Sequence, residues 1–195
     1  AKPSVPYGQQ RNITSPGFIQ ACENAEVIPG CREKTGSHLG FYCEFPTKAG
    51  EVVMVKAGIS FVSIAGARAN LAAEIPGWNF DQVHQQAREL WARALDHLTV
   101  EGGSEDHKTI FYSALYRSLL FPQIFGDLDG NYTGGDGKVH HADNFTNRTL
   151  FSGWDEYRSK YPLLTLVEPK VVNDQINSMI ALAEDNGTHY FDRWE

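Results

Sequence analysis

The stretch Phe151–Arg158, FSGWDEYR, holds the residues of this sequence that are best suited to bind a sugar. The carboxylate of Asp155 can accept hydrogen bonds from sugar hydroxyls, and the ring of Trp154 can pack on a sugar face. Arg158 follows Asp155 by three residues, so on one helix the two would share a face, and Arg158 could orient the carboxylate. We therefore take Trp154, Asp155 and Arg158 as candidate substrate-binding residues.

A structural interpretation of the same stretch stays open. Ser152 followed three residues later by Asp155 is the pattern of a helix capping box, in which the carboxylate only satisfies a backbone N–H. Arg158 and Asp155 could likewise form a surface ion pair of little energetic value. The local pattern alone does not decide between a cap and a sugar ligand.

A second acidic segment, around Asp127, has part of the pattern of a calcium loop. Asp127, Asp129 and Asn131 alternate as in an EF-hand. Such a loop would need glycine at the position of Tyr132 and a carboxylate at the position of Lys138. We therefore expect a structural turn here and assign no metal ligand.

No other motif indicates catalysis. The sequence has no nucleophile elbow, Walker loop or HExxH pair. His140 and His141 have no carboxylate or cysteine at ligand spacing, so we expect a solvated pair. No residue is assigned as a general acid or base.

The composition is that of a globular protein without a basic surface. Hydrophobic residues make up 42%, and 17 Lys and Arg stand against 24 Asp and Glu, a net charge of −7. A nucleic-acid partner would need a clustered basic face, so it is excluded. No apolar run reaches the roughly 18 residues of a membrane span, and the first residues lack a signal-peptide core, so we expect no membrane partner.

The cysteines and sequons bear on the cellular compartment. Cys22, Cys31 and Cys43 contain no CxxC pair; Cys22 and Cys31 could close a short loop, or all three could be thiols. Five Asn-x-Thr sequons occur, where about one or two would arise by chance. They are at Asn12, Asn131, Asn144, Asn147 and Asn186. This excess favours the secretory route, and we expect a secreted or periplasmic protein.

The first part of the chain reads as strands. Residues 41–46 and 51–65 are dense in Val, Ile and Phe, and residues 47–50 can connect them as a hairpin. Alternation predicts a sheet with one buried face. That face consists of Val53, Val55, Ala57, Ile59 and Phe61.

The second part reads as helices. Asn79 with Gln82 predicts the start of one helix, and Ser104 predicts the start of another. The apolar stripes of these two helices have helical spacing. They are Val83, Ala87, Leu90, Trp91, Ala94, Leu95 and Leu98, and then Ile110, Phe111, Ala114, Leu115 and Leu119.

Two more helices are expected further along. One begins at Ser152 and runs through Arg158, with Leu164 as an alternative end. The next has Pro169 in its first turn and stops at Asn186-Gly187. The apolar face of the last helix consists of Val172, Ile176, Met179, Ile180 and Ala183. Strands followed by helices indicate two domains.

Several segments, in this order, resemble glycoside hydrolase family 92. They are Val55–Trp78 (VKAGISFVSIAGARANLAAEIPGW), the following helix with Trp91, Phe111–Leu119 (FYSALYRSL), Asp127–Gly137 (DLDGNYTGGDG) and Phe151–Leu166 (FSGWDEYRSKYPLLTL). The resemblance implies an α+β multidomain fold, with the end of an N-terminal β-sandwich followed by the first helices of a truncated (α/α)6 barrel. The implied boundaries are 1–78 for the sandwich part, 79–103 for a linker helix and strand, and 104–195 for the incomplete catalytic barrel.

The resemblance also implies an activity. The family consists of calcium-dependent exo-α-mannosidases that invert the anomeric centre, so the implied partners are mannose-terminated glycans and the remainder of the same polypeptide. Trp154 and Asp155, with Arg158, would line the subsite for the terminal mannose. The general acid, the general base and most calcium ligands would lie beyond Glu195, so residues 1–195 alone are expected to be inactive.

Two alternatives remain. The chain could be a complete carbohydrate-binding module without catalysis, which would fold alone and bind mannosides through Trp154. It could also belong to another toroidal glycosidase, acting on glucosides, although the set of motifs argues against this.

Overall fold

A computed structural model describes residues 4–5, 18–23, 26–28, 34–36, 39–149, 152–188 and 190. The chain divides into two compact units, Ala1–Trp78 and Asn79–Glu195. Their expected identities as sandwich and barrel parts stay predictions. Asn12, Cys31 and the side chains of Cys22 and Cys43 lie outside the described structure, and so the pairing of the cysteines also stays a prediction.

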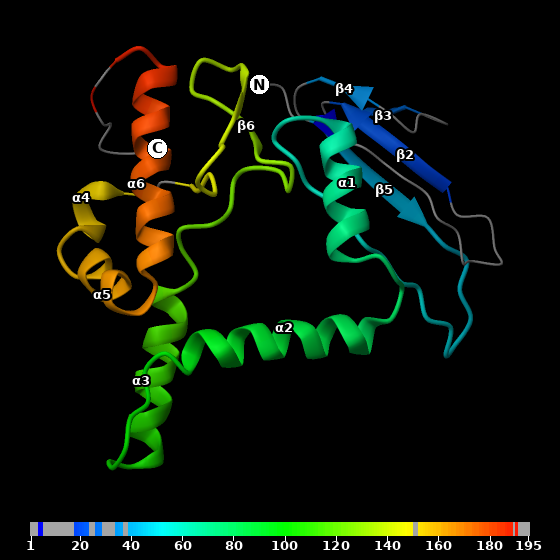
Figure 1. Ribbon diagram of the computed structural model, residues 1–195. Coiled ribbons are helices and arrows are strands. Elements are labelled where there is room, and N and C mark those ends of the chain that lie inside the picture. The colour runs from blue at the N-terminus through cyan, green and yellow to red at the C-terminus, as the bar shows by residue number, and fades with distance from the viewer. Residues whose placement is uncertain are drawn as a thin grey trace. The chain divides into compact units, whose positions relative to one another are not determined.

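The first unit contains a small antiparallel sheet in the strand order β3-β2-β5 (Figure 1). Its strands are β2 (Phe18–Glu23), β3 (Glu26–Ile28) and β5 (Leu39–Glu44). A separate pair joins β1 (Ser4–Val5) to β4 (Lys34–Thr35). The strand predicted over 41–46 is confirmed as part of β5, which begins two residues earlier and ends at Glu44.

The strand predicted over 51–65 is wrong. Residues 45–62 contain no strand, and helix α1 (Ile64–Glu74) begins after Ser63, whose hydroxyl accepts a hydrogen bond from Gly66 N at 2.9 Å. The preceding segment lies along this helix: Asn70 Nδ2 donates to Ile59 O at 3.0 Å. A Cβ on Gly58 would lie 2.3 Å from Ala67 O, so only glycine permits this close approach.

The predicted inward face of that segment is also wrong. Val55, Ile59 and Phe61 are 78%, 71% and 53% exposed. Of the alternate positions, 56, 58, 60 and 62 are half-buried, whereas Val52 and Met54 are exposed. The ammonium of Lys56 donates to Ile75 O at 2.8 Å and lies 4.8 Å from the centre of the Trp78 ring. The half-buried face is therefore the one opposite to the predicted face, and it includes a lysine whose long aliphatic stem can be covered while its ammonium is hydrogen-bonded.

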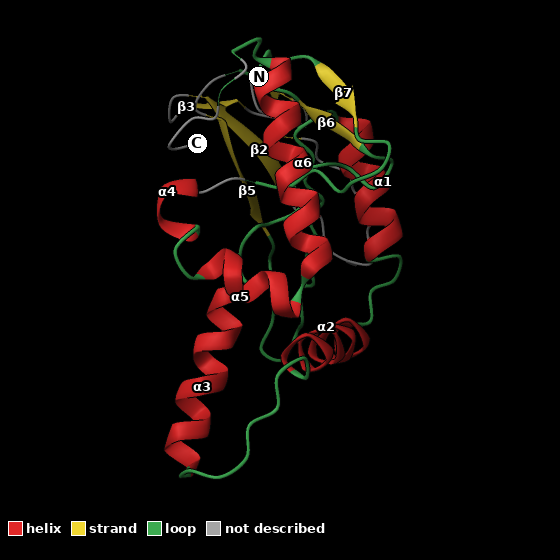
Figure 2. Cartoon of the chain, turned by 60° about the vertical axis from the view of Figure 1, so that its left-hand side comes forward, coloured by secondary structure: helices red, strands yellow, loops and turns green. Residues whose placement is uncertain are grey.

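In its described residues, the second unit contains helices and one short hairpin (Figure 2). The helices are α2 (Phe80–Leu95), α3 (Glu105–Ser118), α4 (Gly153–Glu156), α5 (Lys160–Val167) and α6 (Pro169–Asp185). The hairpin pairs β6 (Asn131–Thr133) with β7 (Val139–His141). No helix in the described part of the chain combines the length and apolarity that crossing a membrane would require.

The first two helices begin where the sequence predicts. Asn79 Oδ1 accepts from Gln82 N at 3.1 Å, and Ser104 Oγ accepts from His107 N at 3.2 Å. Trp91 of the first predicted stripe packs on Tyr116, which lies outside the second predicted stripe, with ring centres 4.4 Å apart. Leu115 is buried, but other stripe residues, Leu90 and Ile110 among them, remain exposed on the described surface.

The expected third helix is interrupted. Helix α4 ends at Glu156, a turn covers residues 157–159, and α5 begins at Lys160. The last helix has the predicted ends: Pro169 is in the first turn, and Gly187 follows the C-cap Asn186 with φ +65°. This φ lies in the left-handed region that favours glycine.

The face of α6 that is buried differs from the prediction. Of the expected apolar stripe, Ala183 is buried, but Ile176 and Ile180 are 49% and 43% exposed. The most buried positions along α6 are instead Asp174, Gln175 and Ser178. Asp174 and Ser178 have partners in a distant loop, which helical periodicity cannot reveal, whereas neither side-chain amide atom of Gln175 has a hydrogen-bond partner in the described structure.

Candidate functional site

The corner around Ser152 places Asp155 at the start of a short helix. Ser152 is 1% exposed and forms the N-cap of α4, yet its side chain caps no backbone N–H. Instead its hydroxyl donates to Asp155 Oδ2 at 2.9 Å, while Ser152 O accepts from Asp155 N at 3.1 Å. The expected capping box is therefore not formed, because the serine hydroxyl bonds the carboxylate itself.

The carboxylate of Asp155 keeps accepting capacity. Asp155 is exposed, and no further hydrogen bond or ion pair of its side chain occurs within the described residues. A carboxylate has about four lone-pair sites, of which the Ser152 hydroxyl occupies one. The position is thus pre-oriented by a buried donor and open to hydroxyl donors of a ligand.

Trp154 and Arg158 lie together, but not as expected. The guanidinium carbon of Arg158 is 5.5 Å from the centre of the Trp154 ring and 5.8 Å from that of Tyr157. Arg158 lies beyond the end of α4, and within the described part it makes no ion pair with Asp155. The expectation that Arg158 orients Asp155 is therefore wrong: it contacts the aromatic rings, and Trp154 stays 50% exposed.

Behind this corner lies a buried ionic cluster around Glu156. Glu156 is 6% exposed, forms an ion pair with Lys160 and accepts from the Tyr161 hydroxyl at 3.5 Å. Burial, followed by the negative charge of Glu156, raises the pKa of Tyr161 to about 12. Glu156 is thus neutralised by its own neighbours and serves to fix the α4–α5 turn, not to meet a ligand.

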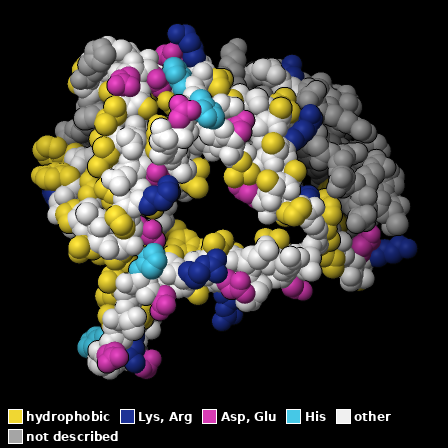
Figure 3. All heavy atoms as spheres, in the orientation of Figure 1, with side chains coloured by type: hydrophobic (Ala, Val, Ile, Leu, Met, Phe, Trp, Pro, Cys, Tyr) yellow, Lys and Arg dark blue, Asp and Glu magenta, His cyan; other side chains and the backbone are white. Residues whose placement is uncertain are grey.

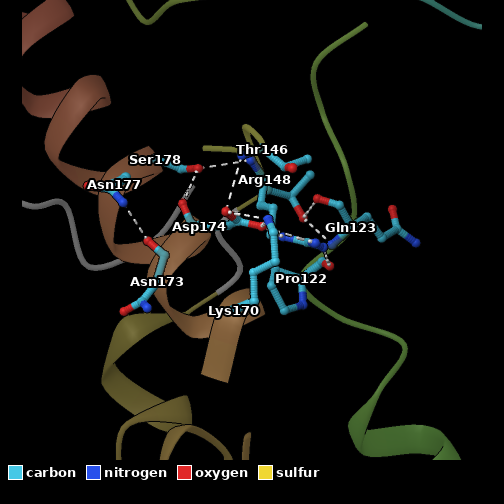
Figure 4. Close-up of polar contacts among 10 residues, drawn as sticks. Pro122, Gln123, Thr146, Arg148, Lys170, Asn173, Asp174, Asn177 and Ser178 are labelled. Atoms are coloured by element: carbon cyan, nitrogen blue, oxygen red, sulfur yellow. Dashed lines mark hydrogen bonds and ion pairs between the residues drawn. The ribbon is translucent and has the colours of Figure 1, made fainter. Parts of the chain in front are cut away.

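A second ionic cluster surrounds Asp174 on α6 (Figure 4). Asp174 accepts from Thr146 N at 3.2 Å, from Lys170 Nζ at 2.9 and 3.1 Å, and from Arg148 Nε and Nη2 at 3.4 Å. Burial acts to raise the pKa of Asp174. The hydrogen bonds from Lys170 and Thr146 N and the charges of Lys170 and Arg148 outweigh it, so the pKa lies below its ordinary value.

The same cluster joins the loop before α4 to α6. Ser178 Oγ accepts from Arg148 N at 2.9 Å and donates to Asp174 O at 2.8 Å. Arg148 Nη1 donates to Pro122 O at 3.2 Å. Every polar group here has a partner inside the unit, which indicates a structural network.

The β6–β7 hairpin is held to the end of α6 by His140. Its Nε2 lies 3.0 Å from Asp136 Oδ1 and its Nδ1 lies 3.2 Å from Asp185 Oδ1. The Tyr132 hydroxyl donates to Asp185 Oδ2 at 3.2 Å. Figure 3 shows histidine and acidic side chains together over this hairpin. The expectation of a solvated pair is thus wrong for His140, because its second carboxylate comes from the far end of α6.

Two ionisable groups around His140 have pKa values that differ from their ordinary ones. Burial, together with Asp185, raises the pKa of Tyr132 to about 12. The backbone N–H of Lys138 and the imidazole of His140 hold the pKa of Asp136 well below its usual range. His141 is half-exposed, with Nδ1 3.1 Å from Asn131 Oδ1.

The segment around Asp127 folds into a turn, as expected. Asp129 accepts from the backbone N and the Nδ2 of Asn131 at 3.0 and 2.8 Å, and Gly130 N donates to Asp127 O at 3.0 Å. Among the described residues, no group of three or more His, Cys, Asp or Glu side chains is placed to hold a metal ion. We assign no calcium ligand at this turn and derive no step through calcium.

Known proteins similar to this chain are glycosidases. Residues 66–195 match the profile of the Glycosyl hydrolase family 92 catalytic domain. A protein of Arthroderma benhamiae, described as an uncharacterized secreted glycosidase, is 33% identical over 98 residues, which are 47% of this chain and 12% of that protein.

Solved structures are similar over most of the chain. The family GH92 α-mannosidase BT3965 from Bacteroides thetaiotaomicron matches with a TM-score of 0.77 and 31% identity, over 91% of this chain and 25% of that one. Its complex with mannoimidazole matches with a TM-score of 0.76, at 31% identity, over 91% and 24%. The inverting mannosidase BT2199 from the same species matches with a TM-score of 0.75 and 26% identity, over 93% and 25%.

Proposed function

This chain belongs to glycosyl hydrolase family 92, and we propose that it is part of an exo-α-mannosidase that removes terminal α-linked mannose with inversion. The chain spans 25% of the solved mannosidase BT3965, so the activity is proposed for the full-length protein. The observation that carries the proposal is the family match, together with similarity to an α-mannosidase and to an inverting mannosidase. The proposed linkage is α-1,2.

Asp155 and Trp154 are the proposed ligands of the terminal mannose. Asp155 is exposed, and Ser152 fixes one of its oxygens, so hydroxyl groups of a sugar can donate to the remaining lone pairs. Trp154 offers a half-exposed indole beside it. The complex of BT3965 with mannoimidazole supports a mannose-shaped ligand for this family. Arg158 would act on the sugar through Trp154, because it contacts that ring.

Bond cleavage needs groups beyond these. An inverting glycosidase uses two carboxyl groups about 6.5–9.5 Å apart, with a water between one of them and the sugar. Asp155 is proposed as a sugar ligand, and Glu156 and Asp174 are engaged by Lys160 and by Arg148 and Lys170. We therefore place the general acid, the general base and the calcium ligands in the remainder of the polypeptide.

We further propose that the protein is secreted or periplasmic. The excess of sequons favours that route, and the similar protein of Arthroderma benhamiae is described as secreted. Terminal mannose on extracellular glycans would then be the substrate.

The test is mannose release by the full-length protein from a simple α-mannoside, with the anomer of the first product read by NMR. We expect β-mannose first, as inversion requires, and loss of activity on calcium chelation. Asp155→Asn should lower kcat/KM about ten- to hundredfold, the cost of a lost hydrogen bond to a charged group. Trp154→Ala should lower kcat/KM as well.

The matched control is Asp143→Asn, because the Asp143 side chain is 82% exposed and lies at the bend after β7, outside the α4 corner. It should leave kcat/KM unchanged. α-Mannose as the first product, or turnover by residues 1–195 alone, would contradict the proposal. Mannoside binding without turnover by the full-length protein would instead indicate a carbohydrate-binding module.

A further inference from the structure

The sequons of the helical unit differ sharply in their surroundings. Four sequon asparagines lie in the described part of the chain: Asn131, Asn144, Asn147 and Asn186. We propose that, of these four, Asn144 is the residue that carries an N-linked glycan when the protein passes through a eukaryotic secretory pathway. This goes beyond the proposed hydrolysis and rests on the secretory route proposed above.

Asn147 is excluded by burial. It is 7% exposed, and its carbonyl accepts from Phe125 N at 2.9 Å and from Gly126 N at 3.4 Å. A Cβ on Gly126 would lie 3.5 Å from Asn147 Cβ, so the loop is packed directly against this residue. A glycan is bulky and needs a surface position, so its attachment to Asn147 would prevent this packing.

Asn131 and Asn186 are engaged in the hairpin. Asn131 Nδ2 donates to Asp129 Oδ2 at 2.8 Å, and its Oδ1 lies 3.1 Å from His141 Nδ1. The amide of Asn186 lies against the hairpin turn: a Cβ on Gly135 would lie 2.1 Å from Asn186 Oδ1 and 2.6 Å from its Nδ2. A sugar on either nitrogen would displace an existing contact.

Asn144 is exposed at a bend after β7, and within the described residues its side chain has no hydrogen bond or ion pair. Asn186 shares both properties, and it is the close approach of Gly135 to its amide that sets it apart from Asn144. The next two residues of its sequon are anchored inward: the Phe145 ring packs near Tyr132, with centres 6.4 Å apart, and Thr146 N donates to Asp174. A glycan on Asn144 therefore displaces no contact that holds the fold.

The reaction is a glycosyl transfer. Asn144 Nδ2 forms a bond to the anomeric carbon of an oligosaccharide carried on a lipid diphosphate. The bond from that carbon to the diphosphate breaks, the lipid diphosphate leaves, and the nitrogen loses one proton. The co-reactant is the lipid-linked oligosaccharide of the secretory pathway, and no oxidant or metal of this chain takes part.

The experiment secretes the full-length protein from a eukaryotic host and removes its glycans with peptide N-glycosidase in ¹⁸O-water, which leaves labelled aspartate at each former site. Trypsin cuts after Lys138 and Arg148, so Asn144 and Asn147 fall in one peptide, VHHADNFTNR. Fragmentation of that peptide then assigns the label to one of the two positions. We expect it at position 144, with none at 147, 131 or 186.

Two variants and a control complete the test. Asn144→Gln should abolish the label in this peptide. Thr146→Ala should do the same while retaining Asn144 and the backbone N–H that Asp174 accepts. The control Asn147→Gln should leave the label at 144. Label at 147, 131 or 186, or a secreted protein without label at 144, would overturn the proposal. Mannose release is measured separately, so failure of this proposal is distinguishable from failure of the proposed function.

Discussion

Asp155 and Asp174 carry the same carboxylate in the same helical unit, but their surroundings are opposite. Asp174 is 3% exposed and accepts from two cationic side chains and a backbone N–H. Asp155 is exposed and accepts one hydroxyl bond from Ser152. A buried carboxylate whose hydrogen-bond acceptor sites are occupied stabilises the fold. An exposed carboxylate that is oriented by one bond and has free acceptor sites can bind a ligand. Substitution of Asp174 should therefore lower stability, whereas substitution of Asp155 should weaken ligand binding.

The largest expected effect is on stability, from Asp174→Asn. The change leaves Arg148, whose side chain is 14% exposed, without its carboxylate, and breaking one partner of a buried pair costs about 3–5 kcal/mol. Hydrogen exchange of the α6 backbone amides in the full-length protein measures this as a lower free energy of opening.

Lys170→Ala is the matched control for Asp174. The Lys170 side chain is 76% exposed, so its loss should cost less than about 1 kcal/mol. If Asp174→Asn lowered the free energy of opening by no more than Lys170→Ala does, the Asp174 cluster would not be a structural network.

The second effect is on alkaline stability, through Tyr132. Its pKa rises from 10.0 to about 12 in the folded chain, so the stability that it contributes is complete below pH 10 and is lost as the pH rises from 10 to 12. This shift corresponds to about 3 kcal/mol. In Tyr132→Phe the loss of unfolding free energy over this interval, measured by denaturant titration, should be smaller by about that amount.

Tyr157→Phe serves as the control, because it also removes a tyrosine hydroxyl, from a residue that is 58% exposed at the α4 corner. We expect the loss of unfolding free energy of this variant between pH 10 and 12 to match that of the unchanged protein. An equal loss in Tyr132→Phe and the unchanged protein would show that the hairpin cluster does not couple Tyr132 to folding.

The smallest effect is on binding, from Arg158→Ala. A cation over an exposed ring contributes about 0.5–1 kcal/mol, so release of the Trp154 ring should weaken mannoside affinity of the full-length protein about two- to fivefold. Isothermal titration calorimetry with an α-mannoside measures this change. Arg158→Lys, which keeps a cation, should recover part of the affinity. A loss as large as that of Asp155→Asn would instead mean that Arg158 touches the sugar.

Local signals in the sequence predicted the helix ends well. The caps at Asn79 and Ser104, Pro169 in a first turn and Gly187 after a helix each depend on a few neighbouring residues. These contacts form wherever the chain turns into or out of a helix, so they can be read without tertiary information.

Features with distant partners were predicted poorly. The buried face of α6 is polar because Arg148 and Thr146 meet it, and His140 is paired because Asp185 reaches it. The strand expected over 51–65 failed because the segment lies along α1, and α1 was missed because its apolar residues do not gather on one face. Periodicity indicates which residues form an apolar face, but it does not indicate which other segments of the chain contact that face.

The candidate site was predicted in part. The residue types of Trp154 and Asp155 pointed to a sugar ligand, and their role stays a prediction. The bond from Ser152 to Asp155 has a visible signal, the Ser-x-x-Asp spacing, but that spacing indicates a possible backbone cap and not a bond between the two side chains. The contact of Arg158 with Trp154 was missed because α4 was expected to continue through Arg158.

The most direct test of the central claim compares binding with stability in one variant. Mannoimidazole is titrated calorimetrically into the full-length protein and its Asp155→Asn variant, and the thermal unfolding midpoint of each is recorded. We predict about ten- to hundredfold weaker binding with an unchanged midpoint, because Asp155 is exposed and holds no fold contact beyond Ser152. Unchanged affinity, or a fall in midpoint large enough to explain the loss, would contradict the assignment of Asp155 as a mannose ligand.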